Sequence, residues 1–200
     1  MYRGNSSRVV PILLVLIVIA IAIAALVSAG RAIFGGTDQA AQSQVDVGRD
    51  NLLNTSLSHS VRMTVRGPIV ADENFRSYQV TVNPSDRSIT TYSGYLDQVL
   101  DAKQYSNNAK AYEEFVYALD KANLMKGEVL KDGKDDTRGI CATGRVYEFE
   151  VLKDGRAVKR LWTSTCKGSV GSLKASVAQV ETLFHNQIPD SRAVLRTIDL

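Results

Sequence analysis

The chain has few of the residues on which familiar chemistries depend. Its 200 residues include only two cysteines, two histidines and four prolines. A disulfide-dense mini-protein is therefore excluded, and without a Cys-x-x-Cys pair a zinc site has no paired ligands. The ordinary share of apolar residues, 44%, excludes a disordered or collagen-like chain. We expect a globular domain that needs no cofactor and holds no metal.

An excess of one charge is also missing from most of the chain. The formal net charge of +3 reflects 24 Lys and Arg against 21 Asp and Glu. Arg3, Arg8 and Arg31 lie in the first 31 residues, which contain no acid, so acidic and basic residues balance in the remainder. A nucleic-acid binder needs a surplus of cations to neutralise phosphates. Nucleic-acid binding is therefore not expected.

Catalytic motifs are missing as well. The sequence contains no Gly-x-Ser-x-Gly nucleophile elbow, phosphate loop or dinucleotide fingerprint. Glu148 and Glu150 share one predicted strand face, as a catalytic carboxylate pair could, but Arg160 is available as an ordinary cross-strand partner. No catalytic residue is assigned, and whether the chain is an enzyme stays open.

One long apolar run is the strongest signal. Residues 9–27 carry no charge and would span about 29 Å as a helix, close to the hydrocarbon thickness of a bilayer. With Arg3 and Arg8 before the run, the amino terminus should stay in the cytoplasm. We predict a cytoplasmic segment at 1–8 and a transmembrane helix at 9–29, whose partner is the lipid bilayer.

A cleaved secretory signal is the alternative, because the small residues up to Ala29 suit a signal peptidase. The run exceeds the usual signal-peptide length of about 7–15 residues, which favours an uncleaved anchor. Either way the remainder is exported. The predicted location is the cell membrane, with a single span and the C-terminal domain outside.

Beyond the span, we predict a juxtamembrane stalk at residues 30–59 and an extracytoplasmic α+β domain at residues 60–200. The stalk contains a helical repeat that Thr37 or Asp38 could cap, formed by Ala41, Val45, Gly48 and Leu52. Apolar residues alternate over 61–66, 78–82 and 88–93, which predicts three strands. Helical spacing follows over 108–123.

A second hairpin and a last helix complete the predicted domain. Taking residues 153–155 as a three-residue loop pairs Tyr147 with Leu161 and Val151 with Ala157. A helix capped by Ser172 is expected next, on the spacing of Leu173, Val177, Val180 and Phe184. The expected fold is α+β, an antiparallel sheet of about five strands in the order β-β-β-α-β-β-α with two packed helices.

The two cysteines test the register of this hairpin. A bulge at Gly144 would bring Cys141 directly opposite Cys166 across the ladder. We predict a structural disulfide, which export permits and which would contribute roughly 3.5 kcal/mol in the chain-entropy model. Reactive or metal-binding thiols are the alternative.

The chain resembles a group of uncharacterised single-pass membrane proteins from candidate-phyla bacteria. The resemblance rests on residues 61–70, on Cys141 with residues 144–147, on residues 161–166 and on residues 187–190. It implies membrane anchoring and surface location. It implies no activity, ligand or catalytic residue.

Three functions are consistent with these features. The first is an interaction or assembly module for an envelope protein or a second copy, with Trp162 as an exposed anchor unless the last helix covers it as core. The second is a binder of a small anion or envelope polymer, with contacts from Arg62, Arg66, Arg76 and Arg145. The third is an exported hydrolase, for which His185 is the only obvious base.

Overall fold

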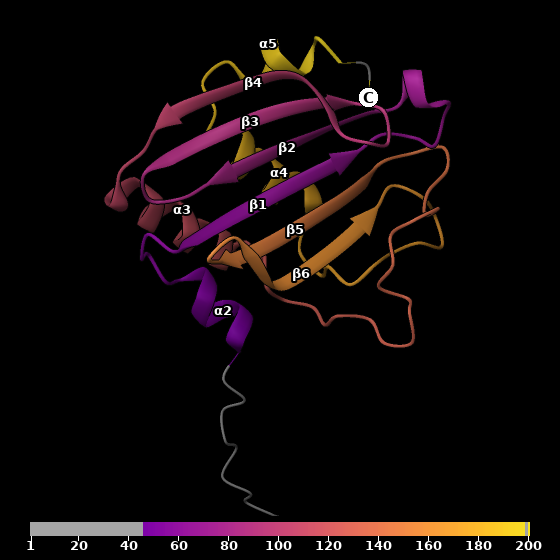
Figure 1. The fold of residues 1–200 in the computed structure, drawn as a ribbon. Coiled ribbons are helices and arrows are strands. Elements are labelled where there is room, and N and C mark those ends of the chain that lie inside the picture. The colour runs from indigo at the N-terminus through magenta and orange to yellow at the C-terminus, as the bar shows by residue number, and fades with distance from the viewer. Residues whose placement is uncertain (1–45, 199) are drawn as a thin grey trace, which may run out of the picture. The chain divides into compact units, whose positions relative to one another are not determined.

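The structure, a computed structural model, describes residues 46–198 and 200 of the chain. Residues 46–200 form one compact unit built on a six-stranded antiparallel sheet (Figure 1). The predicted cytoplasmic segment and transmembrane helix lie outside the described residues. Within the described part of the chain, every helix is too short or too polar to cross a bilayer.

The α+β class and the antiparallel sheet are confirmed, but the sheet has six strands instead of about five. Their spatial order is β4-β3-β2-β1-β5-β6, so β1 lies in the interior of the sheet. The strands are β1 (His59–Arg66), β2 (Arg76–Val82), β3 (Asp86–Ser93), β4 (Gln98–Ser106), β5 (Val146–Lys153) and β6 (Arg156–Ser164).

The additional strand is β4. Seven of its nine residues are exposed, and its sequence has no apolar alternation that could mark a half-buried strand. Its ladder with β3 also contains an irregularity between Thr91 and Tyr92, which leaves Leu100 without a cross-strand partner. This strand therefore forms because it pairs with β3, and its own sequence contains no pattern that predicts it.

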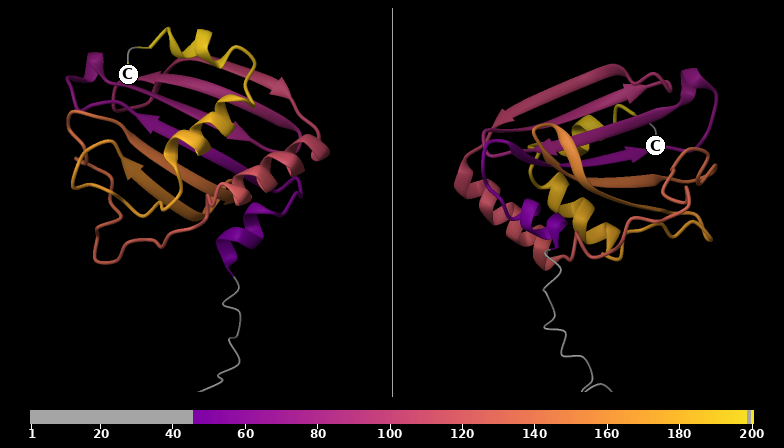
Figure 2. Two further views of the ribbon diagram at one scale, coloured as in Figure 1. Left: turned by 180° about the vertical axis from the view of Figure 1, so that it is seen from behind. Right: turned by 60° about the horizontal axis from the view of Figure 1, so that its bottom comes forward.

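Helices cover one face of the sheet (Figure 2). The two predicted helices are α3 (Ala109–Lys121) and α4 (Val177–His185). Asn108 caps α3 by accepting a hydrogen bond from the amide of Ala111 at 2.9 Å. Two short helices were not expected in the domain, α2 (Val47–Leu52) and α5 (Ser191–Leu195).

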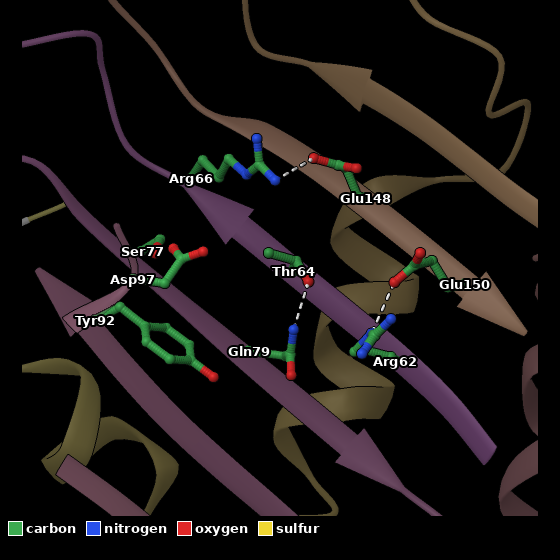
Figure 3. A pocket seen from close by; sticks show the side chains of 9 residues that line it. All are labelled: Arg62, Thr64, Arg66, Ser77, Gln79, Tyr92, Asp97, Glu148 and Glu150. Atoms are coloured by element: carbon green, nitrogen blue, oxygen red, sulfur yellow. Dashed lines mark hydrogen bonds and ion pairs between the residues drawn. The ribbon is translucent and has the colours of Figure 1, made fainter. Parts of the chain in front are cut away.

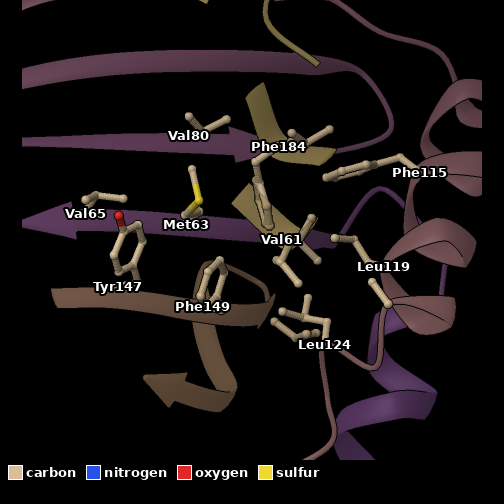
Figure 4. Packing of buried hydrophobic residues seen from close by; sticks show 14 of the residues in the cluster. Val61, Met63, Val65, Val80, Phe115, Leu119, Leu124, Tyr147, Phe149 and Phe184 are labelled. Carbon is tan, nitrogen blue, oxygen red and sulfur yellow. The ribbon is translucent and has the colours of Figure 1, made fainter. Parts of the chain in front are cut away.

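The core lies between these helices and the sheet (Figure 4). Alternate β1 residues Val61, Met63 and Val65 are fully buried, as period two predicts. From the helices, Phe115 and Phe184 meet edge to face with centroids 5.3 Å apart. Burying this layer is the main stabilising contribution, at about 25 cal/mol per Å² of apolar surface.

The segment assigned to the stalk is partly folded. Its helix α2 begins at Val47, with Asp46 as N-cap, and Leu52 is fully buried in the core. Arg49 forms a two-pronged ion pair with Asp120 of α3, at 2.7 and 2.9 Å. The compact unit therefore begins at Asp46, not at residue 60. Thr37 and Asp38 lie outside the described residues.

The predicted register of the second hairpin is wrong by two residues. Asp154 and Gly155 both have positive φ, 50° and 74°, so they form a two-residue turn that pairs Lys153 with Arg156. A bulge between Val151 and Leu152 completes the shift, and Phe149 faces Leu161. Because two is the side-chain period of a strand, the residues from Val146 to Val151 keep their predicted faces. Beyond the bulge the shift is one residue, and Ala157 pairs with Leu152 instead of Val151.

The disulfide between Cys141 and Cys166 is confirmed, although its predicted placement is wrong. Cys141 has a φ of 60° and lies in a turn that the amide of Gly144 closes onto its carbonyl at 3.3 Å. The bridge therefore joins the chain just beyond the ends of β5 and β6. Gly144 belongs to the turn and forms no strand bulge.

The last helix begins later than predicted. Ser176 occupies its N-cap position, and Val177 is its first residue. The hydroxyl of Ser172 instead accepts a hydrogen bond from the amide of Trp162 at 3.0 Å. Residues that were expected to open the helix therefore run along strand β6.

Candidate functional site

The structure does not bring the predicted contact residues together. Arg62 and Arg66 lie on the sheet face opposite α3 and α4, and they line a groove of about 260 Å³ (Figure 3). Arg76 and Arg145 line two other hollows. Trp162 is buried. No single site is therefore formed by these five residues.

The groove, which we call the ionic groove, is polar throughout. Its lining residues come from β1, β2, β3, β5 and the turn before β4: Arg62, Thr64, Arg66, Ser77, Gln79, Tyr92, Asp97, Glu148 and Glu150. Arg62 contacts Glu150 at 2.7 Å, and Arg66 contacts Glu148 at 3.4 Å. Gln79 donates to the Thr64 hydroxyl at 3.2 Å.

The charges of the ionic groove do not favour an anion. Its two arginines face three carboxylates, from Asp97, Glu148 and Glu150. Glu148 is only 6% exposed and is also held by Arg160, at 2.8 Å. Both predicted arginine contacts are therefore engaged by acids, and the carboxylates act as structural partners in the way the sequence suggested for Glu148 and Arg160.

Trp162 is core, but the last helix does not cover it. Its side chain is 2% exposed and packs with Cys141 and Val146 on the face opposite α3 and α4. The loop between α3 and β5 covers it with Leu130 and Ile140. Its indole nitrogen donates to Asp135 at 3.0 Å. The residue is therefore not accessible as a partner anchor.

A different cluster lies at the helix-covered face. The Tyr78 hydroxyl of β2 lies 3.2 Å from Oε1 of Glu181 and 3.0 Å from Nε2 of His185, both on α4. When Tyr78 donates to the carboxylate, His185 donates to the tyrosine oxygen, which fixes the proton on Nε2. No sequence signal links these residues, because more than 100 positions separate Tyr78 from the other two.

Burial dominates the electrostatics of this cluster. It raises the pKa of Tyr78 well above its usual value and lowers the pKa of His185, while Glu181 acts in the opposite direction on His185. The tyrosine therefore stays protonated, and the histidine is neutral near pH 7. His185 was expected at the surface, but it is half-buried and hydrogen-bonded.

A cavity of about 460 Å³ opens beside the cluster. It is lined by Tyr78, Arg145, Glu181, His185, Leu195, Arg196, Ile198 and Leu200. Arg145 also donates to the main-chain oxygen of Leu200. Arg76, by contrast, is tied to main-chain oxygens of Glu73 and Phe75, each at 2.8 Å. Of the four predicted arginines, Arg145 lines this cavity, together with Arg196.

The two edges of the sheet differ. At the β6 edge, the main-chain amide of Trp162 donates to the Ser172 hydroxyl. The carbonyl of Trp162 accepts a hydrogen bond from the amide of Leu173 at 2.9 Å. A Cβ at Gly171, whose φ is 73°, would lie 2.2 Å from the Trp162 carbonyl oxygen, so glycine permits this close approach. The following segment thus covers the outer backbone of β6 around Trp162.

At the β4 edge, no strand or loop of the described chain hydrogen-bonds to the outer backbone. Leu96, Val99 and Leu100 are 94%, 57% and 50% exposed at the start of this strand. We call β4 with this apolar end the open edge. Sequence reasoning missed it because the strand itself was missed.

No metal centre accompanies these features: among residues 46–198 and 200, no three His, Cys, Asp or Glu side chains are placed to hold a metal ion.

Comparisons found no protein-family model and no curated protein that matches the chain.

Proposed function

We propose that the chain is a membrane-anchored extracytoplasmic interaction or assembly module whose partner binds at the open edge. The observation that carries this proposal is the contrast between the two sheet edges. The β6 edge is covered around Trp162 by residues 169–174, while the outer backbone groups of β4 have no hydrogen-bond partner among the described residues and lie beside exposed leucines. Partners commonly add a strand to such an edge.

Two further features support the location. Residues 9–27 are long and apolar enough for a membrane anchor. The disulfide between Cys141 and Cys166 is typical of oxidising compartments outside the cytoplasm. An exported, tethered domain fits a binding role better than a hydrolase, since in the part of the chain that the structure describes the cavity beside His185 is lined by no serine, threonine or cysteine.

The test is crosslinking of the full chain in its own membrane, followed by capture and mass spectrometry. Ala102→Pro removes the outward-facing amide at the middle of β4, and edge strands tolerate proline where the amide faces solvent. We expect this variant to lose the crosslinked partner while its unfolding temperature changes little.

A matched control lies on the opposite edge. Val158→Ala alters a partly exposed apolar residue of β6 and should leave capture unchanged. Equal capture by wild type and Ala102→Pro would contradict the proposal, and so would crosslinking that traps other complexes of the same membrane but no partner of this chain.

A second candidate function is binding of a small amphipathic anion at the Tyr78–His185 cavity. Arg145 and Arg196 line it against a single side-chain carboxylate, from Glu181, and Leu195, Ile198 and Leu200 supply apolar surface. Octanoate titrated calorimetrically into the full chain should bind at millimolar concentration or below, and Arg145→Met should abolish the heat. If the wild-type protein gives no heat of binding at about 10 mM octanoate, this site is excluded.

A further inference from the structure

We propose that the partner at the open edge is a second copy of this chain, paired antiparallel through β4 with Ala102 at the twofold axis. This inference rests on the proposed function and specifies the partner. A second copy supplies an identical free edge, so each strand satisfies the backbone groups of the other. The register follows from the hydrogen-bond pattern and the charges of β4.

The ladder with β3 determines which backbone groups of β4 point outward. The amide of Asn107 donates to the carbonyl of Ser85 at 2.8 Å, so Asp86 and Ser106 form a non-hydrogen-bonded pair. Pairs alternate along an antiparallel ladder. Gln104 and Ala102 are therefore also non-hydrogen-bonded toward β3, and their amides and carbonyls face away from the sheet.

A twofold axis through any residue of β4 pairs even-numbered residues with even-numbered ones. With such an axis, the outward-facing amides and carbonyls of one copy lie opposite those of the other copy. An axis that passes midway between two residues would instead place outward-facing backbone groups opposite residues whose groups face β3. The backbone thus permits several registers, centred on residues from 100 to 104. The side chains select among them.

Only the axis through Ala102 sets Asp101 opposite Lys103 of the second copy, and it does so twice by symmetry. An axis through Asp101 would oppose two carboxylates, and one through Lys103 would oppose two ammonium groups. Opposite charges across a ladder stabilise a strand pair, while like charges destabilise it. Within the described residues, neither Asp101 nor Lys103 forms an ion pair inside its own chain.

The rest of β4 is compatible with this pairing. Leu100, which has no partner on β3 and is 50% exposed, comes opposite Gln104 of the second copy. The residue at the axis is alanine, which is small enough to sit beside its own symmetry mate. The pairing of about five residues is short, so the complex is weak unless both copies are anchored in one membrane, which raises their effective concentration.

A charge-swap cycle tests the register. The full chain reconstituted in lipid vesicles, where both copies share one membrane, is compared with Asp101→Lys, Lys103→Asp and the double variant by energy transfer between fluorescently labelled copies. Each single variant opposes like charges twice, and we expect the dimer dissociation constant to rise roughly tenfold or more. The double variant restores both pairs and should recover most of the wild-type affinity. Single variants without effect, or a double variant as weak as the singles, would overturn the register.

Cysteine crosslinking gives an independent readout. Under oxidation Ala102→Cys should yield a covalent dimer on its own. Leu100→Cys and Gln104→Cys should each stay monomeric but crosslink when mixed, because cross-strand neighbours fall within disulfide range. Efficient self-crosslinking of Gln104→Cys instead of Ala102→Cys would place the axis elsewhere and overturn the proposal.

Failure of this inference differs from failure of the proposed function. If the full chain stays monomeric in its membrane while Ala102→Pro still abolishes capture of another protein, self-pairing is overturned and the open edge remains the binding site. If the chain is monomeric and Ala102→Pro changes no crosslink, both are overturned.

Discussion

At the residue scale, Trp162 shows how an aromatic residue can be buried by a segment that no sequence pattern marks. The sequence left open whether it is an exposed anchor or core beneath the last helix, and the structure buries it on the sheet face opposite α3 and α4. Its cover comes from the loop between α3 and β5, which carries no regular apolar pattern. Burial at this position could therefore not be predicted from periodicity.

Replacing Trp162 with alanine should be strongly destabilising. The change leaves a cavity between Cys141 and Val146 and removes the hydrogen-bond donor to Asp135, so we expect a loss of about 3–5 kcal/mol in the free energy of unfolding. Denaturant unfolding measures it. Leu96→Ala, at a side chain that is 94% exposed, is the control and should change stability by less than about 0.5 kcal/mol.

Tyr112, unlike Trp162, carries a buried polar group that makes no hydrogen bond to stabilise the fold. The residue is fully buried on α3, and its hydroxyl has no hydrogen-bond partner among the described residues. Tyr112→Phe removes this unsatisfied group, and we expect stability to rise by about 1 kcal/mol. Tyr117→Phe, on an exposed tyrosine of the same helix, should be neutral. A loss of stability in Tyr112→Phe would mean that the hydroxyl is satisfied.

At the scale of elements, predictions succeeded where side-chain period decides the structure. Strands β1, β2 and β3 and helix α3 follow from alternation or helical spacing, and β1, β2 and α3 bury the residues that their patterns indicate. In β3, Ile89 is buried, but Tyr92 lines the ionic groove on the opposite face. They failed where turn geometry or a neighbour decides. The register of β5 and β6 depends on whether Asp154 joins the turn with positive φ, and β4 depends on pairing with β3.

The disulfide links two such elements beyond the ends of their ladder. Its partners are separated by 25 positions, and closing a loop of this size should contribute about 3.5 kcal/mol in the chain-entropy model. Reduction with dithiothreitol should lower the urea midpoint accordingly. A variant with both cysteines replaced by alanine should begin at the lower midpoint and not respond to reductant. A reductant effect that persists in this variant would assign the loss to something other than the bridge.

At the scale of the whole molecule, the candidate sites were the least predictable part. The ionic groove joins four strands, and the Tyr78–His185 cluster joins β2 to α4, so both depend on tertiary packing. The sequence indicated only that arginines recur on polar strand faces. It could not indicate that carboxylates from β5 engage two of them.

Stability of the whole domain should depend on pH through its two histidines. His59 is 3% exposed, and burial, reinforced by Lys153, lowers its pKa below the usual value of 6.5; burial also lowers that of His185. The unfolded chain therefore binds more protons as pH falls. Stability contributed by the neutral rings is complete above about pH 6.5 and is lost as pH falls through the folded pKa values.

Thermal unfolding between about pH 7.5 and pH 5 measures this dependence. The unfolding temperature should fall over that window in the wild type and much less in His59→Gln/His185→Gln, because the chain has no other histidine. A wild-type profile that is flat between pH 7.5 and pH 5 would contradict the lowered pKa values.

The position of β1 has a mechanical consequence. Helix α2 connects directly into β1, and this strand is bonded along its length to β2 on one side and β5 on the other. Tension applied from the amino-terminal side of the domain first meets the short helix with its Arg49–Asp120 ion pair. Beyond that point it loads two antiparallel ladders in shear, so many hydrogen bonds must break together. The domain is thus built to yield at α2 under a weak pull and to hold its sheet under a stronger one.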